Sequence, residues 1–306
     1  MRFLKDFMTM QNKKLITHND SFHSDDVFAC TTLCLMLEKN KESFEIIRTR
    51  DPEIIKTGDY VFDLGGIYDE KINRFDHHQI GGAGKRENGI EYSSFGLVWK
   101  KFGKILTGSD KAVELIDERL AAAVDALDNG LDLVENKYAV TPYYLENIFF
   151  SMRPTWREEN LSQDEMFLKS VEMAKVILSR EIIQAQDRIL AEEIVTSIYN
   201  NTADKKIIIL DKNYPYEYVL NNFPEPLFVI YFKKSNDSWQ VRAVRNDPKS
   251  FKNRKNFPVS WAGLRDEELQ KITGVSDAMF CHRGLFLVVA KSKEGAVKLA
   301  QIAVES

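Results

Sequence analysis

The chain has 306 residues, of which 44% are hydrophobic and 29% charged, and its formal net charge at pH 7 is −4. This length is sufficient for two ordinary domains, and no apolar run approaches the roughly 18 to 20 residues that cross a bilayer. A negative net charge provides no overall attraction for nucleic acid, so any such binding must come from a local basic patch.

Residues 1–13 mix basic and apolar side chains, and we interpret them as a disordered leader, with a cleaved organellar address as the alternative. The three cysteines, Cys30, Cys34 and Cys281, are too few for a disulfide framework and indicate a reducing compartment. We therefore expect a cytoplasmic protein with no membrane partner.

Strand-like and helical stretches alternate in the first half of the chain. A strand is expected at 14–18, followed by a helix over 25–39 with Ser24 as its N-cap. Further strands are expected at 44–50, 60–66 and 74–78, and helices at 93–106 and 109–130, the last closed by Gly130. This alternation predicts an α/β domain with a mostly parallel sheet covered on both faces.

The second half begins with a stretch from 162 to 199 that lacks glycine and proline and has helical spacing, which predicts a long connecting helix. Several strand-like runs and a final helix follow, which indicates a second, smaller α/β or α+β domain. We expect a domain with the candidate site at 14–155, a helical connector at 156–202 and a substrate-binding domain at 203–306.

Ionisable residues gather at the predicted strand ends. Four of the five histidines lie in two short motifs, "THNDSFHSDD" and "FDHHQ". Side chains just past the carboxyl ends of strands in an open α/β sheet converge on one crevice. The candidates for that crevice are His18, His23, Asp25, Asp63, Asp76, His77 and His78, joined from the end of a helix by Asp125 or Asp128.

Four or five carboxylates in one crevice repel one another unless cations neutralise them. Mixed imidazole and carboxylate ligands suit Mn²⁺, with Zn²⁺, Fe²⁺ or Co²⁺ as alternatives, whereas Ca²⁺ fits badly. Two ions about 3.5 to 4 Å apart would clamp a phosphoryl group and lower the pKa of a bridging water. The structural alternative is that Asp25 and Asp26 complement a helix dipole and that Asp125 and Asp128 lie on a solvated helix face.

These motifs resemble those of the DHH phosphoesterase superfamily, which includes RecJ-type exonucleases, family II inorganic pyrophosphatases and oligoribonucleases. The chain is more similar still to one branch, the melanocyte proliferating gene (MYG) exonuclease family, over about residues 14–305. The motifs that carry the resemblance are "THNDSFHSDDVFAC", "RTRDP", "VFDLGGIYD", "FDHHQ", "VDALDNG", "WAGLRDEEL" and "CHRGLF".

The resemblance implies roles for the candidate residues. One ion would be held by His18, His23 and Asp63, and the other by Asp25, Asp63, His77 and Asp125, which we prefer to Asp128. His78 would face the substrate phosphate as a catalytic residue, and Asp76 would orient a neighbouring imidazole. The broad superfamily has an aspartate where this chain has His23, which leaves the metal preference open.

The segment 233–255 contains eight basic and two acidic residues, and Trp239, Phe251, Phe257 and Trp261 lie in or just after it. This composition suits phosphate contacts and base stacking, although a solubilising loop over core aromatics is the alternative. The chain lacks the "GGGH" run of many DHH C-terminal domains. The expected substrate-binding residues are Lys252, Arg254, Arg265, His282 and Arg283.

The segment "QIGGAGKR" at 79–86 does not match a phosphate-binding loop, because Gln79 and Arg86 replace the required glycine and hydroxyl residue. We interpret it as a flexible flap beside the metals.

The leading hypothesis is a two-metal phosphodiesterase, a 3′–5′ exonuclease on single-stranded RNA or short oligonucleotides that uses a metal-activated hydroxide. One alternative is a phosphohydrolase for a small phosphoanhydride or dinucleotide. Another is a non-catalytic, metal-dependent nucleotide-binding module. The sequence leaves open whether the protein is a homo-oligomer.

Overall fold

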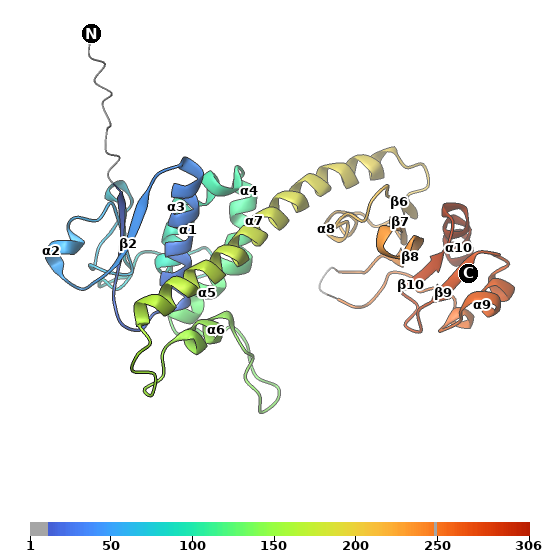
Figure 1. Cartoon of the computed structure of the whole chain (residues 1–306). Coiled ribbons are helices and arrows are strands. Elements are labelled where there is room, and N and C mark those ends of the chain that lie inside the picture. The colour runs from blue at the N-terminus through green and yellow to red at the C-terminus, as the bar shows by residue number, and fades with distance from the viewer. Residues whose placement is uncertain (1–11, 248–249) are drawn as a thin grey trace, which may run out of the picture. The chain divides into compact units, whose positions relative to one another are not determined.

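The computed structural model describes residues 12–247 and 250–306, which divide into two compact units that meet between Gln186 and Asp187. The boundary falls inside the 39-residue helix α7 (Gln163–Asn201), which runs from one unit into the other (Figure 1). The expected long helix is confirmed. The division into three segments stays a prediction, and most of the expected leader lies outside the described residues.

The N-terminal unit is built on a five-stranded sheet in the order β2-β1-β3-β5-β4. Four of the strands are parallel, and only β4 at the edge runs antiparallel to its neighbour β5. The mostly parallel sheet is therefore confirmed. The strands are β1 (Lys13–Thr17), β2 (Phe44–Arg48), β3 (Tyr60–Phe62), β4 (Tyr68–Asp69) and β5 (Arg74–Phe75).

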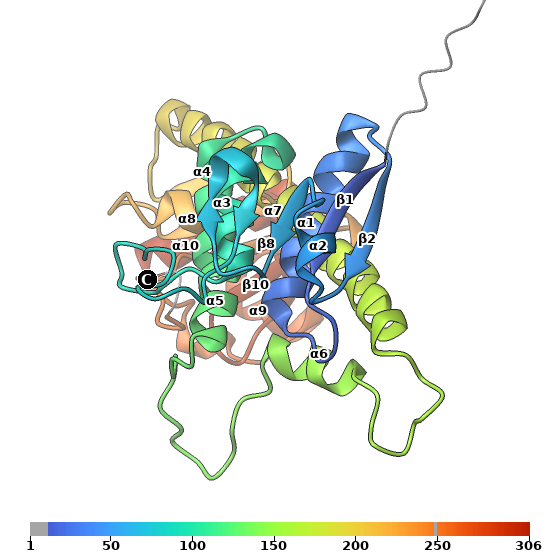
Figure 2. The same cartoon turned by 90° about the vertical axis from the view of Figure 1, so that its left-hand side faces the viewer.

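Helices lie on both sides of this sheet, but unequally. The short α2 (Pro52–Ile55) lies on one side, and α1 (Ser24–Asn40) and α3 (Ser94–Thr107) lie on the other (Figures 1 and 2). Most of α1 is buried, because its apolar run leaves few polar positions to face solvent. Its N-cap is His23 rather than the expected Ser24, which is the first helical residue.

The expected helix at 109–130 is interrupted. It consists of α4 (Asp110–Ile116), a turn of π-helix (Asp117–Ala121) and α5 (Ala122–Asp128), and Gly130 follows in the left-handed conformation with φ 72°. Turns of π-helix occur frequently at functional sites because they rotate the following residues relative to the preceding helix. After α5, an extended segment leads to α6 (Leu145–Met152) and then to α7.

The register of the three central strands decides where the site lies. Leu15 of β1 pairs with Tyr60 of β3, and Phe62 of β3 pairs with Phe75 of β5. Because β1, β3 and β5 are adjacent and parallel, the residues that follow them emerge at the same edge of the sheet. The convergence of strand ends expected from the sequence is thus present.

The C-terminal unit contains a second five-stranded sheet in the order β6-β7-β8-β10-β9, in which only β6 and β7 pair in parallel. Side chains of β7 alternate between its two faces: Phe228 and Ile230 belong to one core, and Val229 and Tyr231 to another. The unit comprises β6 (Ile207–Ile209), α8 (Glu217–Leu220), β7 (Phe228–Lys233), β8 (Ser238–Ala243), α9 (Asp266–Thr273), β9 (Ala278–Cys281), β10 (Leu287–Ala290) and α10 (Lys293–Glu305). Among the helices of residues 12–247 and 250–306, none has the length and hydrophobicity that a membrane span requires.

Candidate metal centre

Asp63 is the central residue of the cluster at the sheet edge. It follows β3 directly and adopts φ 53°, a left-handed conformation that aspartate tolerates better than most residues. Its Oδ2 lies 3.1 Å from Nε2 of His18, which follows β1, and its Oδ1 lies 3.4 Å from Nε2 of His77. The Ser94 hydroxyl donates to Oδ1 at 3.2 Å. The two carboxylate oxygens of Asp63 therefore face different imidazoles, as a bridging ligand requires.

The N-terminus of α1 contributes two buried carboxylates. Oδ1 of Asp26 accepts a hydrogen bond from the backbone amide of His23 at 2.9 Å, and Oδ2 lies 3.3 Å from Nε2 of His18. Asp25 is fully buried, and neither of its oxygens accepts a hydrogen bond from any residue that the structure describes. Its Oδ2 lies 3.9 Å from Nε2 of His77. A buried charged group without hydrogen bonds is costly unless a cation lies beside it.

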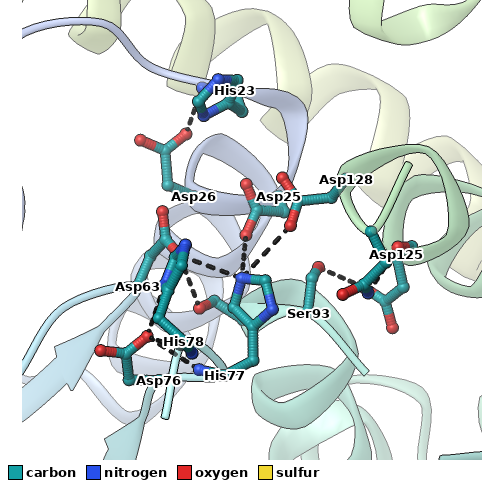
Figure 3. A network of polar contacts seen from close by, with 12 residues as sticks. His23, Asp25, Asp26, Asp63, Asp76, His77, His78, Ser93, Asp125 and Asp128 are labelled. Carbon is teal, nitrogen blue, oxygen red and sulfur yellow. Dashed lines mark hydrogen bonds and ion pairs between the residues drawn. The ribbon is translucent and has the colours of Figure 1, made fainter. Parts of the chain in front are cut away.

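Asp125, the preferred late ligand, is not brought to this cluster (Figure 3). Its Oδ1 accepts hydrogen bonds from the Ser93 hydroxyl at 2.6 Å and the Gly96 amide at 3.0 Å, and its Oδ2 lies 2.7 Å from Nη2 of Arg86. Burial raises the pKa of Asp125 to about 6, against the opposing effect of Arg86 and Ser93. The carboxylate of Asp125 thus has its partners within the protein.

Asp128, the alternative to Asp125 as the late ligand, lies in the cluster at the sheet edge. It ends α5, and its Oδ2 lies 3.2 Å from Nε2 of His77. With His23 and Asp25 it forms a group whose ligand atoms lie within 4.8 Å of one another. The geometry therefore favours Asp128 over Asp125.

Asp76 organises the turn that carries both histidines. Its Oδ1 accepts the backbone amides of His77 at 2.8 Å and His78 at 3.1 Å, and lies 2.8 Å from Nδ1 of His78. Its Oδ2 accepts the amide of Gly66 at 2.5 Å. These contacts give both oxygens of Asp76 partners within its own segment of the chain and fix the ring of His78, whose side chain is 63% exposed.

The carboxylates do not share one electrostatic environment. Burial, followed by the charge of Asp63, raises the pKa of Asp25 far above its ordinary value and that of Asp26 to about 8. Burial and Asp63 also raise the pKa of Asp128. Asp63 differs: burial opposes its ionisation, but hydrogen bonds with His18 and His77 outweigh burial and lower its pKa.

The pKa values of the imidazoles are also raised, but by neighbouring carboxylates and against the effect of burial. The contact with Asp76 raises the pKa of His78 to about 9, against the effect of burial. Burial disfavours the charged forms of His18 and His77, but contact with Asp63 outweighs it, so their pKa values are raised. The carboxylate of Asp63 therefore stabilises the charged forms of the two imidazoles beside it.

These donors fit divalent metal ions. Among the described residues, ligand atoms lie within 4.8 Å of one another in three groups: His18 with Asp26 and Asp63, Asp63 with His77 and His78, and His23 with Asp25 and Asp128. Asp63 belongs to two of them. The mixture of imidazole and carboxylate suits Mn²⁺, Fe²⁺, Co²⁺ or Zn²⁺. The motif "THNDSFHSDD" contains Asp26, but the sequence-based assignment gives it to neither ion, although its place beside Asp25 in the first turn of α1 was a usable signal.

The segment interpreted as a flap is anchored at its end. Nε and Nη2 of Arg86 each donate to Asp117 at 2.7 Å, Nη2 also contacts Asp125, and the guanidinium lies 4.3 Å from the ring centroid of Tyr92. The guanidinium is largely buried. Arg86 therefore attaches this segment to the π-helical turn and to α5, the helix that carries Asp128.

The cluster opens into a cavity of about 940 Å³. Arg50 lines it, whereas Arg48 points elsewhere and pairs with Asp164 at 2.6 Å. Residues of α6 and its N-cap, among them Tyr144 and Phe150, form another part of the wall. No sequence pattern indicated these α6 residues, because they follow an irregular segment.

The expected substrate-binding residues of the C-terminal unit have different environments. Arg254 donates to the carbonyl oxygens of three residues, at 2.5 to 3.1 Å, and so is bound within the unit. The guanidinium of Arg265 lies 4.5 Å from the ring centroid of Phe280, and Nδ1 of His282 accepts the Gly284 amide at 2.9 Å. Lys252 and Arg283 are exposed.

The aromatic residues around the basic segment also differ. Phe257 and Trp261 belong to the core, as the structural alternative anticipated, whereas Phe251 is exposed. Phe251, Phe286, Arg242 and Arg245 line a separate cavity of about 190 Å³. The C-terminal unit therefore offers one small cavity in which aromatic and basic side chains meet.

A family model described as "Uncharacterised protein family (UPF0160)", MYG1_exonuc, matches residues 14–304. "MYG1 exonuclease" of Bos taurus is 31% identical over 95% of this chain and 84% of its own length, and that of Homo sapiens is 28% identical over 95% and 86%. "MYG1 protein" of Chlamydia trachomatis is 30% identical over 91% of this chain and 92% of its own. Among solved structures, a "pGpG-specific phosphodiesterase", PggH from Vibrio cholerae, is 13% identical with a TM-score of 0.30, covering 96% of this chain and 98% of that one.

Proposed function

The chain belongs to the MYG1 exonuclease family, and from this premise we propose that it is a two-metal phosphodiesterase, a 3′–5′ exonuclease on single-stranded RNA or short oligonucleotides. Its bovine and human relatives are named exonucleases, which supports a hydrolase. The choice of RNA, the polarity and Mn²⁺ as the ion are parts of the proposal.

One observation carries the proposal: the buried carboxylate of Asp25 accepts no hydrogen bond in the described structure and lies among Asp63, Asp128 and His77. A structural carboxylate in the same unit, Asp125, has three partners within 3.0 Å. The contrast indicates that Asp25 is kept for a ligand outside the polypeptide, and the surrounding imidazoles and carboxylates indicate a cation.

The geometry supports the following ligand sets. Asp63 would be shared between two ions; His18 and Asp26 would hold one of them with it, and His77, Asp25, Asp128 and His23 would hold the other. Two divalent ions held there would supply a hydroxide nucleophile at neutral pH and neutralise the phosphoryl oxygens. Asp125 has no place in this assignment.

Residues around the ligands would orient the substrate. Asp76 holds Nδ1 of His78, which leaves Nε2 of this ring as the nitrogen that can contact a phosphoryl or leaving oxygen. Among the described residues that line the cavity, Arg50 is the one lysine or arginine, so we assign it to a substrate phosphate.

The test uses the purified full chain with Mn²⁺ and labelled single-stranded RNA, single-stranded DNA, dinucleotides and pyrophosphate. We expect mononucleotides from RNA and close to two bound ions per chain. The Asp63→Asn variant should lose more than about 100-fold in turnover and bind fewer ions, because it removes the bridge. Absence of turnover on every nucleic-acid substrate would overturn the proposal. If pyrophosphate were the one substrate hydrolysed, the function would instead be that of a phosphoanhydride hydrolase.

A further inference from the structure

Helix α6 is fixed to the helix that carries Asp25 and Asp26. Oε2 of Glu146 accepts the backbone amide of Ser24 at 2.8 Å and also the Ser24 hydroxyl. Phe149, one turn further, is fully buried and meets the ring of Phe28 edge to face at 5.7 Å. These contacts give α6 a defined position beside the metal centre, although the segments that flank it are irregular.

The next residue of α6, Phe150, is directed differently from Phe149. It lines the cavity of the metal centre and is 43% exposed. The centroids of the Phe150 and His23 rings lie 5.9 Å apart in an edge-to-face arrangement. The guanidinium of Arg153 lies 4.0 Å from the centroid of the Phe150 ring. Arg153 is itself held by the carbonyl oxygen of Phe22 at 2.6 Å. One face of the Phe150 ring is thus covered by a fixed side chain, while the ring still contributes to the cavity wall.

We propose that Phe150 is the platform on which a nucleobase of the substrate stacks beside the metal centre, so that the site selects nucleotides over bare phosphoanhydrides. This inference rests on the proposed phosphodiesterase function and adds the chemical class of the group that the cavity recognises. The role of Phe150 is in specificity and positioning.

The charge of the cavity wall favours this assignment. Asp20, Asp63, Asp76, Asp128 and Glu146 line the cavity together with a single arginine. Once the ions, Arg50 and His78 have contacted the scissile phosphate, remaining carboxylates such as Asp20 and Glu146 repel further phosphate groups, so the wall offers little to a substrate made only of phosphates. An uncharged base is not repelled by these carboxylates, and stacking on an aromatic ring stabilises its binding. The cavity, of about 940 Å³, has room for a nucleotide.

The test compares substrates that differ in one base. Two sets of five-nucleotide single strands carry either a normal residue or an abasic residue at the 3′ end or at the 5′ end, and kcat/KM is measured with Mn²⁺. For the wild type, loss of the base at the end that is cleaved should reduce kcat/KM roughly 5- to 150-fold, the range that base stacking on an aromatic residue confers. In Phe150→Ala this ratio should fall to near one, and in Phe150→Trp it should be retained.

Trp156→Ala is the matched control. Trp156 is 83% exposed and is not among the residues that line the cavity. Like Phe150 it has an arginine over its ring, since the guanidinium of Arg157 lies 4.8 Å from the ring centroid. It should keep the wild-type ratio and metal content. Full discrimination in Phe150→Ala overturns the inference. Equal wild-type rates with and without the base overturn it too, but leave the proposed function standing, whereas no turnover of any strand by the wild type refutes both.

Discussion

Nη2 of Arg86 lies 2.7 Å from Oδ2 of Asp125, and the side chains of this ion pair are fully buried for Asp125 and largely buried for Arg86. Asp125 and Asp128 are three residues apart on one helix, yet one is neutralised by an arginine and the other faces imidazoles. The pair therefore separates a structural carboxylate from a candidate ligand within a single helical turn.

Replacement of the two aspartates should have opposite effects. Asp128→Asn should reduce the number of bound ions and lower turnover more than about 100-fold, with little change in the melting temperature of the metal-free protein. Asp125→Asn should destabilise the fold by about 3–5 kcal/mol, since it leaves the buried Arg86 without one partner, but keep the metal stoichiometry of the folded fraction. Denaturant unfolding and elemental analysis distinguish them. If Asp125→Asn loses an ion while Asp128→Asn does not, the assignment is reversed.

Gly96 should be essential for the position of Asp125. A Cβ at residue 96 would lie 1.8 Å from Oδ2 of Asp125 and 2.8 Å from Nη2 of Arg86, so Gly96→Ala must displace the ion pair. Overpacking of this kind costs typically 1–3 kcal/mol, although alanine is the better helix former. Urea unfolding of Gly96→Ala beside Lys100→Ala, an exposed position on the same helix α3, is the measurement. Stability equal to that of the control contradicts the close approach.

The stability of the metal-free protein and the stabilisation by metal should change with pH in opposite directions. The pKa of Asp26 is about 8 in the folded protein and about 3.9 in an unfolded chain. Between these values the folded state binds more protons, so the stability of metal-free protein should fall as pH rises towards 8. His78, whose pKa is raised to about 9, acts in the same direction.

Added Mn²⁺ should stabilise the protein more at pH 8 than at pH 6, because ligand carboxylates must lose their protons to bind it. Melting temperatures in chelator and in Mn²⁺, across pH 5 to 8.5, provide the check. A metal-free protein that becomes more stable towards pH 8 would show that these carboxylates are ionised without a cation.

In the C-terminal unit, the exposed Lys252 and Arg283 are better tests of strand binding than Arg254. If both contact phosphates, the Lys252→Gln, Arg283→Gln double variant should reduce the salt dependence of binding to long single strands by about 1.4 in log–log slope. Dinucleotide turnover should be unaffected. Arg254→Gln, which breaks hydrogen bonds to carbonyls, should instead lower stability. An unchanged slope in the double variant argues against a phosphate-binding role for these two residues.

Much of the site could be predicted because strands impose order. His18, Asp63 and Asp76 each follow a strand directly, and adjacent parallel strands bring the residues that follow them to one edge of the sheet. Helix periodicity is a weaker guide. Asp125 and Asp128 lie on neighbouring faces of one helix, and the choice between them depends on Arg86, which a sequence pattern does not place.

Other residues could not be placed from the sequence, because their positions depend on contacts between distant parts of the chain. Glu146 and Phe150 lie beyond an irregular segment, and their positions depend on contacts with Ser24 and Phe28, more than a hundred residues earlier. The basic composition of residues 233–255 did not distinguish an exposed lysine from an arginine that binds carbonyl oxygens.

The hydrogen bonds from Ser24 to Glu146 join the first turn of α1 to α6. A ligand that immobilises either helix end thereby lowers the entropic penalty for ordering the other. If the substrate contacts α6 as proposed, cation uptake and substrate uptake are thermodynamically coupled, and by reciprocity each should raise the affinity for the other by the same factor.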